Sequence, residues 1–132
     1  MSMTLPYTFR QLLDSLPIAA YLLNPEDRRV VGANPMFCSL MGFTEQELME
    51  LDWPTILMPD YHATAEVVIR TKAMAESITE WHFQKKDGSP LKVYGKYRLT
   101  QVVDDHHKVH ELYFTVLSPI EQVVSAKEFF GE

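Results

Sequence analysis

Two groups of strand-forming residues lie at opposite ends of the chain, and a helix-forming stretch separates them. The first group is a hairpin, with strands expected at 18–23 and 30–33 around the turn Asn24-Pro25-Glu26-Asp27. From Ile78 onward the hydrophobic period is two, which predicts three further strands joined by Asp87-Gly88 and by the turn "DDHHK". Because a lone hairpin is only marginally stable, the two groups should pair in one antiparallel sheet.

Several helix-start signals lie between these two groups. Asn34 is an N-cap candidate with Pro35 at the first helical position, and this helix should end at Gly42, which tolerates positive φ. Thr44 and Glu47 form a capping box that begins a second short helix. A longer helix is then expected at about 60–75. The pattern predicts an α+β fold in which short helices cover one face of the sheet and leave a cavity beneath them.

Flanking helices are expected at both ends, which divides the chain into an N-terminal helix (1–17), a central domain (18–118) and the start of a C-terminal helix (119–132). Thr8 and Gln11 form a capping box for the first helix, whose apolar stripe is Phe9, Leu12, Leu13 and Leu16. That stripe is either a dimer surface or packs on the chain's own sheet. Ser118, Pro119 and Glu121 repeat the helix-start pattern for the last helix.

The composition excludes several classes of function. The 132 residues carry a net charge of −6, and the basic residues are scattered, so a nucleic-acid-binding face is not expected. One cysteine cannot form an internal disulfide, which favours a reducing, cytoplasmic location. The sequence has neither a signal-peptide pattern nor a run of apolar residues long enough to span a membrane.

Four stretches in register resemble the PAS family of sensory domains, over about residues 12–120. They are "NPMFCSLMGFTEQEL", "ILMPDYHA", "KKDGSPLKV" and "ELYFTVLSPIE". The last stretch departs from the family, because Ser118-Pro119-Ile120 stands where the family usually has Asp-Ile-Thr. The resemblance implies a five-stranded sheet of order 2-1-5-4-3, a homodimer, and a linked effector such as a histidine kinase or a GGDEF-type diguanylate cyclase.

The residues best suited to chemistry also have simpler interpretations. Cys38 has no histidine near it in sequence and lies outside the place that matches the cysteine motif of light-sensing relatives, so we expect a packing role and no flavin. His62 lies about one turn before the position that binds haem in some relatives, so haem is not expected either. A third candidate is a cluster of carboxylates and histidines whose spacing matches no closed metal site, so we expect a solvated turn. Its residues are Asp104, Asp105, His106, His107 and His110. We expect no catalytic residues and no metal.

A set of apolar residues, with one asparagine, is expected to line the cavity. Gly95 should leave a hole on the inner face of its strand, since a glycine within a strand often marks a close approach. Such a pocket suits a small, mostly apolar ligand. Two alternatives stay open: a small isomerase or hydrolase, which would need a buried Asp or Glu, and a protein–protein scaffold with a filled core. The candidate lining residues are Asn34, Met36, Phe37, Met41, Met58, Trp81, Phe83, Gly95, Tyr97 and Phe114.

Overall fold

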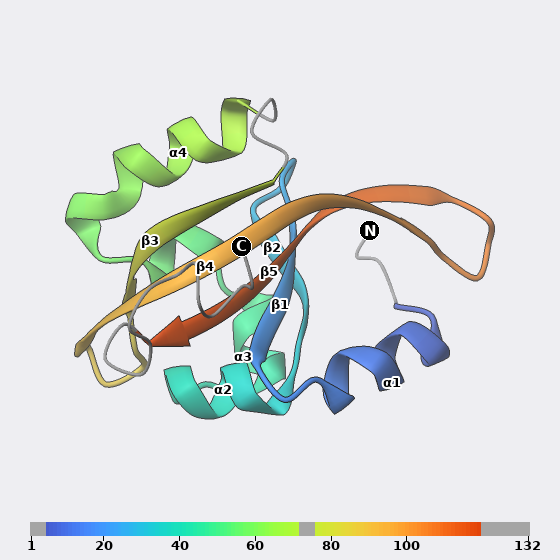
Figure 1. Cartoon of the computed structure of the whole chain (residues 1–132), viewed down its shortest axis with the longest axis horizontal. Helices are drawn as coiled ribbons and strands as arrows, with labels where there is room; N and C mark the ends of the chain where they lie inside the picture. The colour runs from blue at the N-terminus through green and yellow to red at the C-terminus, as the bar shows by residue number, and fades with distance from the viewer. Residues whose placement is uncertain (1–4, 72–75, 120–132) are drawn as a thin grey trace.

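The computed structural model describes residues 5–71 and 76–119 and is built around one antiparallel sheet of five strands (Figure 1). The strand order is β2-β1-β5-β4-β3, as the resemblance to the PAS family implies. The first hairpin joins the three later strands through pairing of β1 with β5. The strands are β1 (Ala19–Asn24), β2 (Arg29–Ala33), β3 (Glu76–Gln84), β4 (Pro90–Val103) and β5 (Val109–Pro119).

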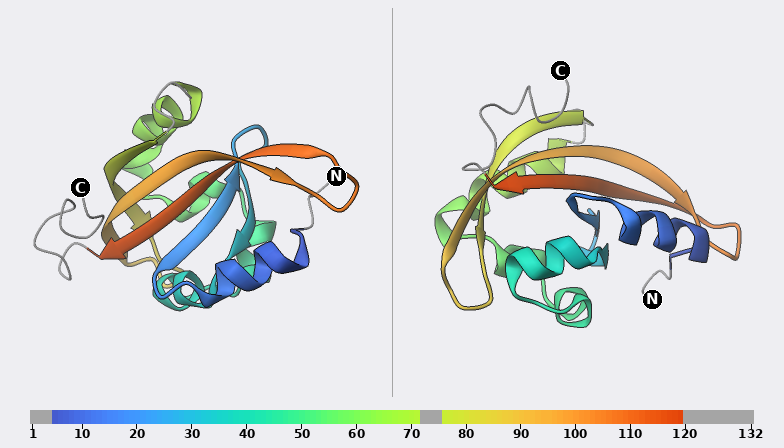
Figure 2. Two further views of the ribbon diagram at one scale, coloured as in Figure 1. Left: turned by 45° about the vertical axis from the view of Figure 1, so that its right-hand side comes forward. Right: turned by 60° about the horizontal axis from the view of Figure 1, so that its bottom comes forward.

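Short helices cover one face of this sheet, and the first helix covers part of the other (Figure 2). The covering elements are α2 (Pro35–Met41), α3 (Glu45–Glu50), α4 (His62–Thr71) and the 3-10 turns η1 (Trp53–Ile56) and η2 (Pro59–Tyr61). Their buried side chains meet those of the sheet in the larger of two hydrophobic clusters. The smaller cluster lies beneath α1 (Tyr7–Ser15). Both sheet faces are therefore partly buried.

The helix starts in the middle of the chain form as predicted. Asn34 caps α2 by accepting a hydrogen bond from the Phe37 N–H, and α2 ends at Gly42, whose φ is +81°. Thr44 and Glu47 form both hydrogen bonds of their capping box. These local signals fix the joint between the two short helices.

The predicted capping box of the first helix is wrong. The helix begins at Tyr7, with Pro6 as its N-cap residue, so Thr8 already lies within the first turn. Gln11 instead donates a hydrogen bond from Nε2 to the Tyr7 hydroxyl, at 3.1 Å. The long helix expected at 60–75 is also shorter in the described residues, because η2 precedes α4 and the described part of α4 ends at Thr71.

The apolar stripe of α1 divides between the sheet and solvent. Leu13 is buried, and Phe9 and Leu16 pack beside it on the outer face of the sheet. Gly32 on β2 permits this approach, since a Cβ there would lie 2.6 Å from the Leu5 side chain. Leu12, by contrast, is 62% exposed. Most of the stripe thus packs within its own chain, and dimerisation through it stays a prediction.

The last strand extends through the predicted start of the C-terminal helix. Ser118 pairs with Tyr94 and Pro119 with Val93, so both residues belong to β5. Pairing with β4 holds this backbone extended, and the helix expected to begin with Ser118 as its N-cap and Pro119 at its first position does not begin there. Glu121 lies outside the described residues. In the part of the chain that the structure describes, none of the helices has the length and apolar character needed to cross a membrane.

One buried side chain joins α1, β1 and α2. The side-chain amide of Asn34 is fully buried, and both its oxygen and its nitrogen form hydrogen bonds. Its oxygen accepts hydrogen bonds from the N–H groups of Ala20 and Phe37, each at 3.0 Å. Its Nδ2 donates to the carbonyl oxygens of Leu13 at 3.3 Å and Ile18 at 2.7 Å. Asn34 therefore has a structural role rather than lining a pocket.

Asn34→Asp should destabilise the domain by about 2–4 kcal/mol, because an oxygen replaces the donor that faces two buried carbonyl groups. Urea unfolding followed by circular dichroism measures the change. Asn24→Asp is the matched control, since the Asn24 side chain only accepts a hydrogen bond, from the Glu26 N–H. The control should change stability by less than about 0.5 kcal/mol. Equal stability of the two variants would contradict the role given to Asn34.

Candidate functional site

A small cavity lies between the sheet and the helices. Its volume is about 10 Å³, room for roughly one water molecule. Three neighbouring strands place side chains opposite one another there, because Thr115 pairs with Tyr21 on one side and with Tyr97 on the other. The lining residues are Tyr21, Leu23, Trp53, Trp81, Tyr97, Tyr113 and Thr115.

Trp81 is the centre of the aromatic side chains around the cavity. Its ring centroid lies 5.6 Å from that of Trp53 on η1, 5.5 Å from Tyr61 on η2 and 5.9 Å from Tyr97 on β4. Tyr97 in turn contacts Tyr113 edge to face, at 5.7 Å. Aromatic contacts at such distances are individually favourable. The sheet and the two 3-10 turns are thus packed together through these rings.

Gly95 makes room for the Trp81 indole. A Cβ at position 95 would lie 2.6 Å from Cδ1 and 2.8 Å from Nε1 of Trp81, and 2.9 Å from Leu117. The close approach expected at this glycine is therefore present, but a side chain of the protein itself makes it. The predicted hole on the inner face is filled.

Four buried polar atoms around the cavity have no hydrogen-bond partner among the described residues. They are Nε1 of Trp53, Nε1 of Trp81 and the hydroxyl oxygens of Tyr97 and Tyr113. All four belong to lining residues. An unsatisfied buried group costs about 1–3 kcal/mol, and native proteins contain few of them. Their concentration at one place marks the cavity as the candidate binding site.

Three tyrosines at or near the site, Tyr21, Tyr61 and Tyr113, have raised pKa values. Burial raises the pKa of Tyr21 well above its usual range, although the side chains of Trp53 and Thr115 act in the opposite direction. Burial also raises the pKa of Tyr113, and it raises that of Tyr61 to about 12. The Tyr61 hydroxyl donates to the Glu80 carbonyl oxygen. The phenols therefore keep their O–H groups and can donate hydrogen bonds to an occupant.

A family model described as a PAS domain matches residues 18–117. The chain belongs to the PAS domain family. Among curated proteins, none gives a significant match.

Solved structures of PAS and LOV proteins share the fold at low sequence identity. The PAS domain of an HTR-like protein from Haloarcula marismortui is 14% identical, with a TM-score of 0.69 over 86% of this chain and 95% of its own. A LOV protein from Rhodobacter sphaeroides is 16% identical, with a TM-score of 0.71 over 92% of this chain and 70% of its own. A domain of a sensory box sensor histidine kinase/response regulator from Geobacter sulfurreducens is 17% identical, with a TM-score of 0.63 over 83% of this chain and 90% of its own.

Some of the residues predicted to line the PAS cavity do lie at it. Trp81 and Tyr97 line it directly. Phe37, Met41 and Phe83 are buried in the same cluster but do not line the cavity; Phe37 packs against Tyr21 at 4.7 Å between ring centroids.

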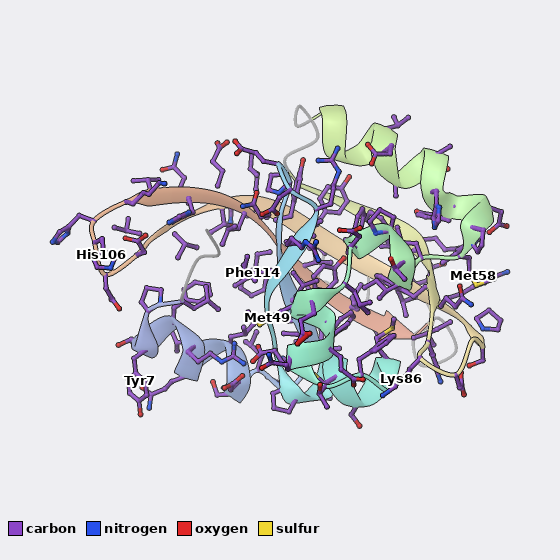
Figure 3. The ribbon with its side chains drawn as sticks, turned by 180° about the vertical axis from the view of Figure 1, so that it is seen from behind. Tyr7, Met49, Met58, Lys86, His106 and Phe114 are labelled. Atoms are coloured by element: carbon purple, nitrogen blue, oxygen red, sulfur yellow. The ribbon has the colours of Figure 1, made fainter. Side chains whose placement is uncertain are left out.

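Other predicted lining residues lie elsewhere. Met36 is 48% exposed, and Met58 lies at the edge of the domain, near the start of α4 (Figure 3). Phe114 lies on the opposite face of the sheet, where it contacts Phe9 of α1 at 6.4 Å. Side-chain alternation along β5 accounts for the position of Phe114, which points away from the face that Tyr113 and Thr115 share.

Sequence reasoning missed five lining residues: Tyr21, Leu23, Trp53, Tyr113 and Thr115. The last strand is apolar on both faces, because α1 covers the face opposite the cavity, so alternation alone could not choose between them. Trp53 lies in a 3-10 turn of four residues, which is too short for a hydrophobic pattern to show which side chains are buried. The sequence Trp53-Pro54 could have indicated this residue, because a large aromatic side chain there stands beside a proline that starts a helical turn.

Cys38 lies partly buried against the core, and His62 lies at the surface. Cys38 is half-buried. Burial is the largest cause that raises the pKa of its thiol, and the negative charge of the nearby Glu45 carboxylate raises it further. A raised pKa disfavours the reactive thiolate. His62 is exposed, and its Nε2 lies 3.2 Å from the Leu57 carbonyl oxygen.

The histidine-rich turn between β4 and β5 is organised by Asp104. One carboxylate oxygen accepts from the N–H groups of His106 at 2.8 Å and Lys108 at 3.0 Å, and the other lies 2.8 Å from Nε2 of His110. His106 lies at the tip of this hairpin, on the side of the domain where α1 lies and away from α4 (Figure 3). In residues 5–71 and 76–119 no three His, Cys, Asp or Glu residues gather closely enough to hold a metal ion.

Gly95→Ala should destabilise the domain by about 1–3 kcal/mol, because the new methyl group forces the buried Trp81 indole to shift. Urea unfolding followed by tryptophan fluorescence measures both the loss of stability and the changed indole environment. Lys92→Ala, at an exposed position on the same strand, is the control and should have little effect. Wild-type stability of Gly95→Ala would mean that Trp81 does not occupy this space.

His110→Ala should raise the pKa of Asp104 from about 2 toward the ordinary value of about 3.9, because the His110 hydrogen bond is the largest cause of its lowering. A carboxyl with a depressed pKa contributes stability above its unfolded pKa, and that contribution is lost as the pH falls toward 2. NMR titration of the Asp104 carboxyl carbon measures the shift. His106→Ala is the control, since only its backbone contacts Asp104. An unchanged Asp104 pKa in His110→Ala would contradict the assignment.

Proposed function

We propose that this PAS domain is a sensory module that binds a small molecule in the cavity beneath η1 and passes the signal to a linked effector. The observation that supports this is the coincidence of one small cavity with four buried polar groups that lack a partner among the described residues. A core selected only for packing would not retain them, because each destabilises the fold. A ligand that satisfied them would recover that energy.

The signal would leave through the end of β5. Thr115 lines the cavity, and Ser118 follows on the same central strand, paired with β4. A ligand that prefers one of two cavity shapes would shift the population of backbone arrangements at Ser118 and Pro119. The proposed output residues are therefore Ser118, Pro119 and Glu121, which lead out of the domain.

The proposed effector is a histidine kinase or a diguanylate cyclase, and the proposed assembly is a homodimer. A structural neighbour is a domain of a sensor histidine kinase, which supports the first of these effectors. On α1, Leu12 and Tyr7 are strongly exposed and offer an apolar surface to a second copy. Phe9, Leu13 and Leu16 would support that surface from beneath.

The enzyme alternative would need a buried acid or base at the cavity. The lining residues include no Asp, Glu or His. The scaffold alternative, in contrast, is favoured by the small volume of the cavity, so the decisive question is whether the protein carries a ligand.

Native mass spectrometry of the protein purified from its own host should reveal a bound small molecule. Adding that molecule to the stripped protein should then slow hydrogen exchange at the cavity strands and change it at the end of β5. Trp81→Ala, which removes the central ring, should abolish retention of the molecule, with Lys92→Ala as the surface control. A chain that carries no small molecule from its host would favour the scaffold instead.

A further inference from the structure

We infer that the cavity selects neutral, planar molecules that present a carbonyl oxygen to it. This inference rests on the proposed ligand-binding function and adds the chemical class of the ligand. It follows from three properties of the lining: its surplus of hydrogen-bond donors, its lack of charge and its small volume.

The unpartnered groups around the cavity are mainly donors. An indole N–H can only donate a hydrogen bond. The Nε1 of Trp81 has no acceptor among the described residues, whereas the Trp53 side chain lies close enough to the Tyr21 hydroxyl to lower the pKa of that group. The hydroxyls of Tyr97 and Tyr113 are free to donate as well. A carbonyl oxygen has two lone pairs and no proton, so it can accept from two of these groups at once without adding a donor that needs a partner. The site is therefore complementary to an acceptor.

The lining carries no compensating charge for an ion. None of the seven lining residues has a charged side chain, and the buried phenols keep their protons. Moving a carboxylate from water into such a site without a cation would cost far more than hydrogen bonds to neutral donors return. A neutral acceptor is thus favoured over an anion.

The volume limits what can enter without rearrangement. A space of about 10 Å³ accommodates one small group, such as the oxygen of a carbonyl. The rest of the molecule must displace part of the cover, which at the cavity is η1 with Trp53. η1 is held by a hydrogen bond from Trp53 N–H to Arg28 O, in the turn between β1 and β2, and the residue before η2 by one from Met58 N–H to His82 O of β3, each at 2.9 Å. Because aromatic rings surround this place, a flat molecule can stack where a bulky one cannot.

Three probes of similar shape test the inference: acetophenone, ethylbenzene and benzoate. Acetophenone has a neutral carbonyl, ethylbenzene lacks it, and benzoate is charged. The chain contains only two tryptophans, so an NMR spectrum of the 15N-labelled protein shows two indole N–H signals, one for each candidate donor. We expect acetophenone to move both signals downfield. Ethylbenzene should bind about tenfold more weakly without that shift, which corresponds to about 1.4 kcal/mol, and benzoate should not bind.

Two variants separate a binding role from a structural one. Tyr97→Phe and Tyr113→Phe each remove a hydroxyl that has no partner within residues 5–71 and 76–119, so the melting temperature without probe should stay the same or rise. Each should reduce the preference for acetophenone over ethylbenzene several-fold. Tyr94→Phe, on the opposite face of β4, is the control and should leave the preference unchanged.

The inference is overturned if acetophenone and ethylbenzene bind equally, if benzoate binds best, or if no probe moves the indole signals. These outcomes are separate from failure of the sensory proposal. A charged or carbonyl-free molecule retained from the host would preserve ligand sensing and reject the chemical class. Absence of any retained molecule, together with probe binding as expected, would instead preserve the selectivity and reject the sensory role.

Discussion

The buried amide of Asn34 is the contact on which the arrangement of this PAS domain depends. It serves the end of α1, the start of β1 and the start of α2 with four hydrogen bonds. Because both ends of the amide are used, no apolar residue and no carboxylate can replace it without leaving buried backbone groups unsatisfied. The position of α2 then places Phe37 against Tyr21, at the edge of the cavity. A single polar side chain thereby sets how the helical layer meets the sheet.

The interior combines dense aromatic packing with incomplete hydrogen bonding. Trp81 contacts four other rings and occupies the space that Gly95 leaves, so the packing is close. Yet two indole N–H groups and two phenol hydroxyls lack partners within the described residues. One buried water could satisfy part of this set. Under the proposed function, a ligand that supplies acceptors would recover part of the remaining cost.

The sequence predicted the fold better than the site, for physical reasons. Capping signals at Asn34, Gly42 and Thr44 are local, and each forms as expected. Strand order followed from the family resemblance and from the need to join two strand groups. The face of each strand was harder to assign. β5 is apolar on both sides because α1 covers the outer face, so Phe114 could not be distinguished from Tyr113 by pattern. Trp53 reaches the cavity from a 3-10 turn, and only tertiary packing places it there.

The central position of β5 links the cavity to the proposed output. β5 pairs with β1 on one side and with β4 on the other, so it cannot move alone. Tyr113 and Thr115 face the cavity, and Ser118 lies three positions beyond Thr115 on the same strand. A change in their hydrogen bonding would therefore act on a stiff, doubly paired strand rather than on a loop. Ser118 and Pro119 stand where the family usually has Asp-Ile, and both still pair with β4. The pairing of β5 with β4 thus continues to Pro119, and a small shift of β5 would be transmitted to the proposed output residues Ser118 and Pro119.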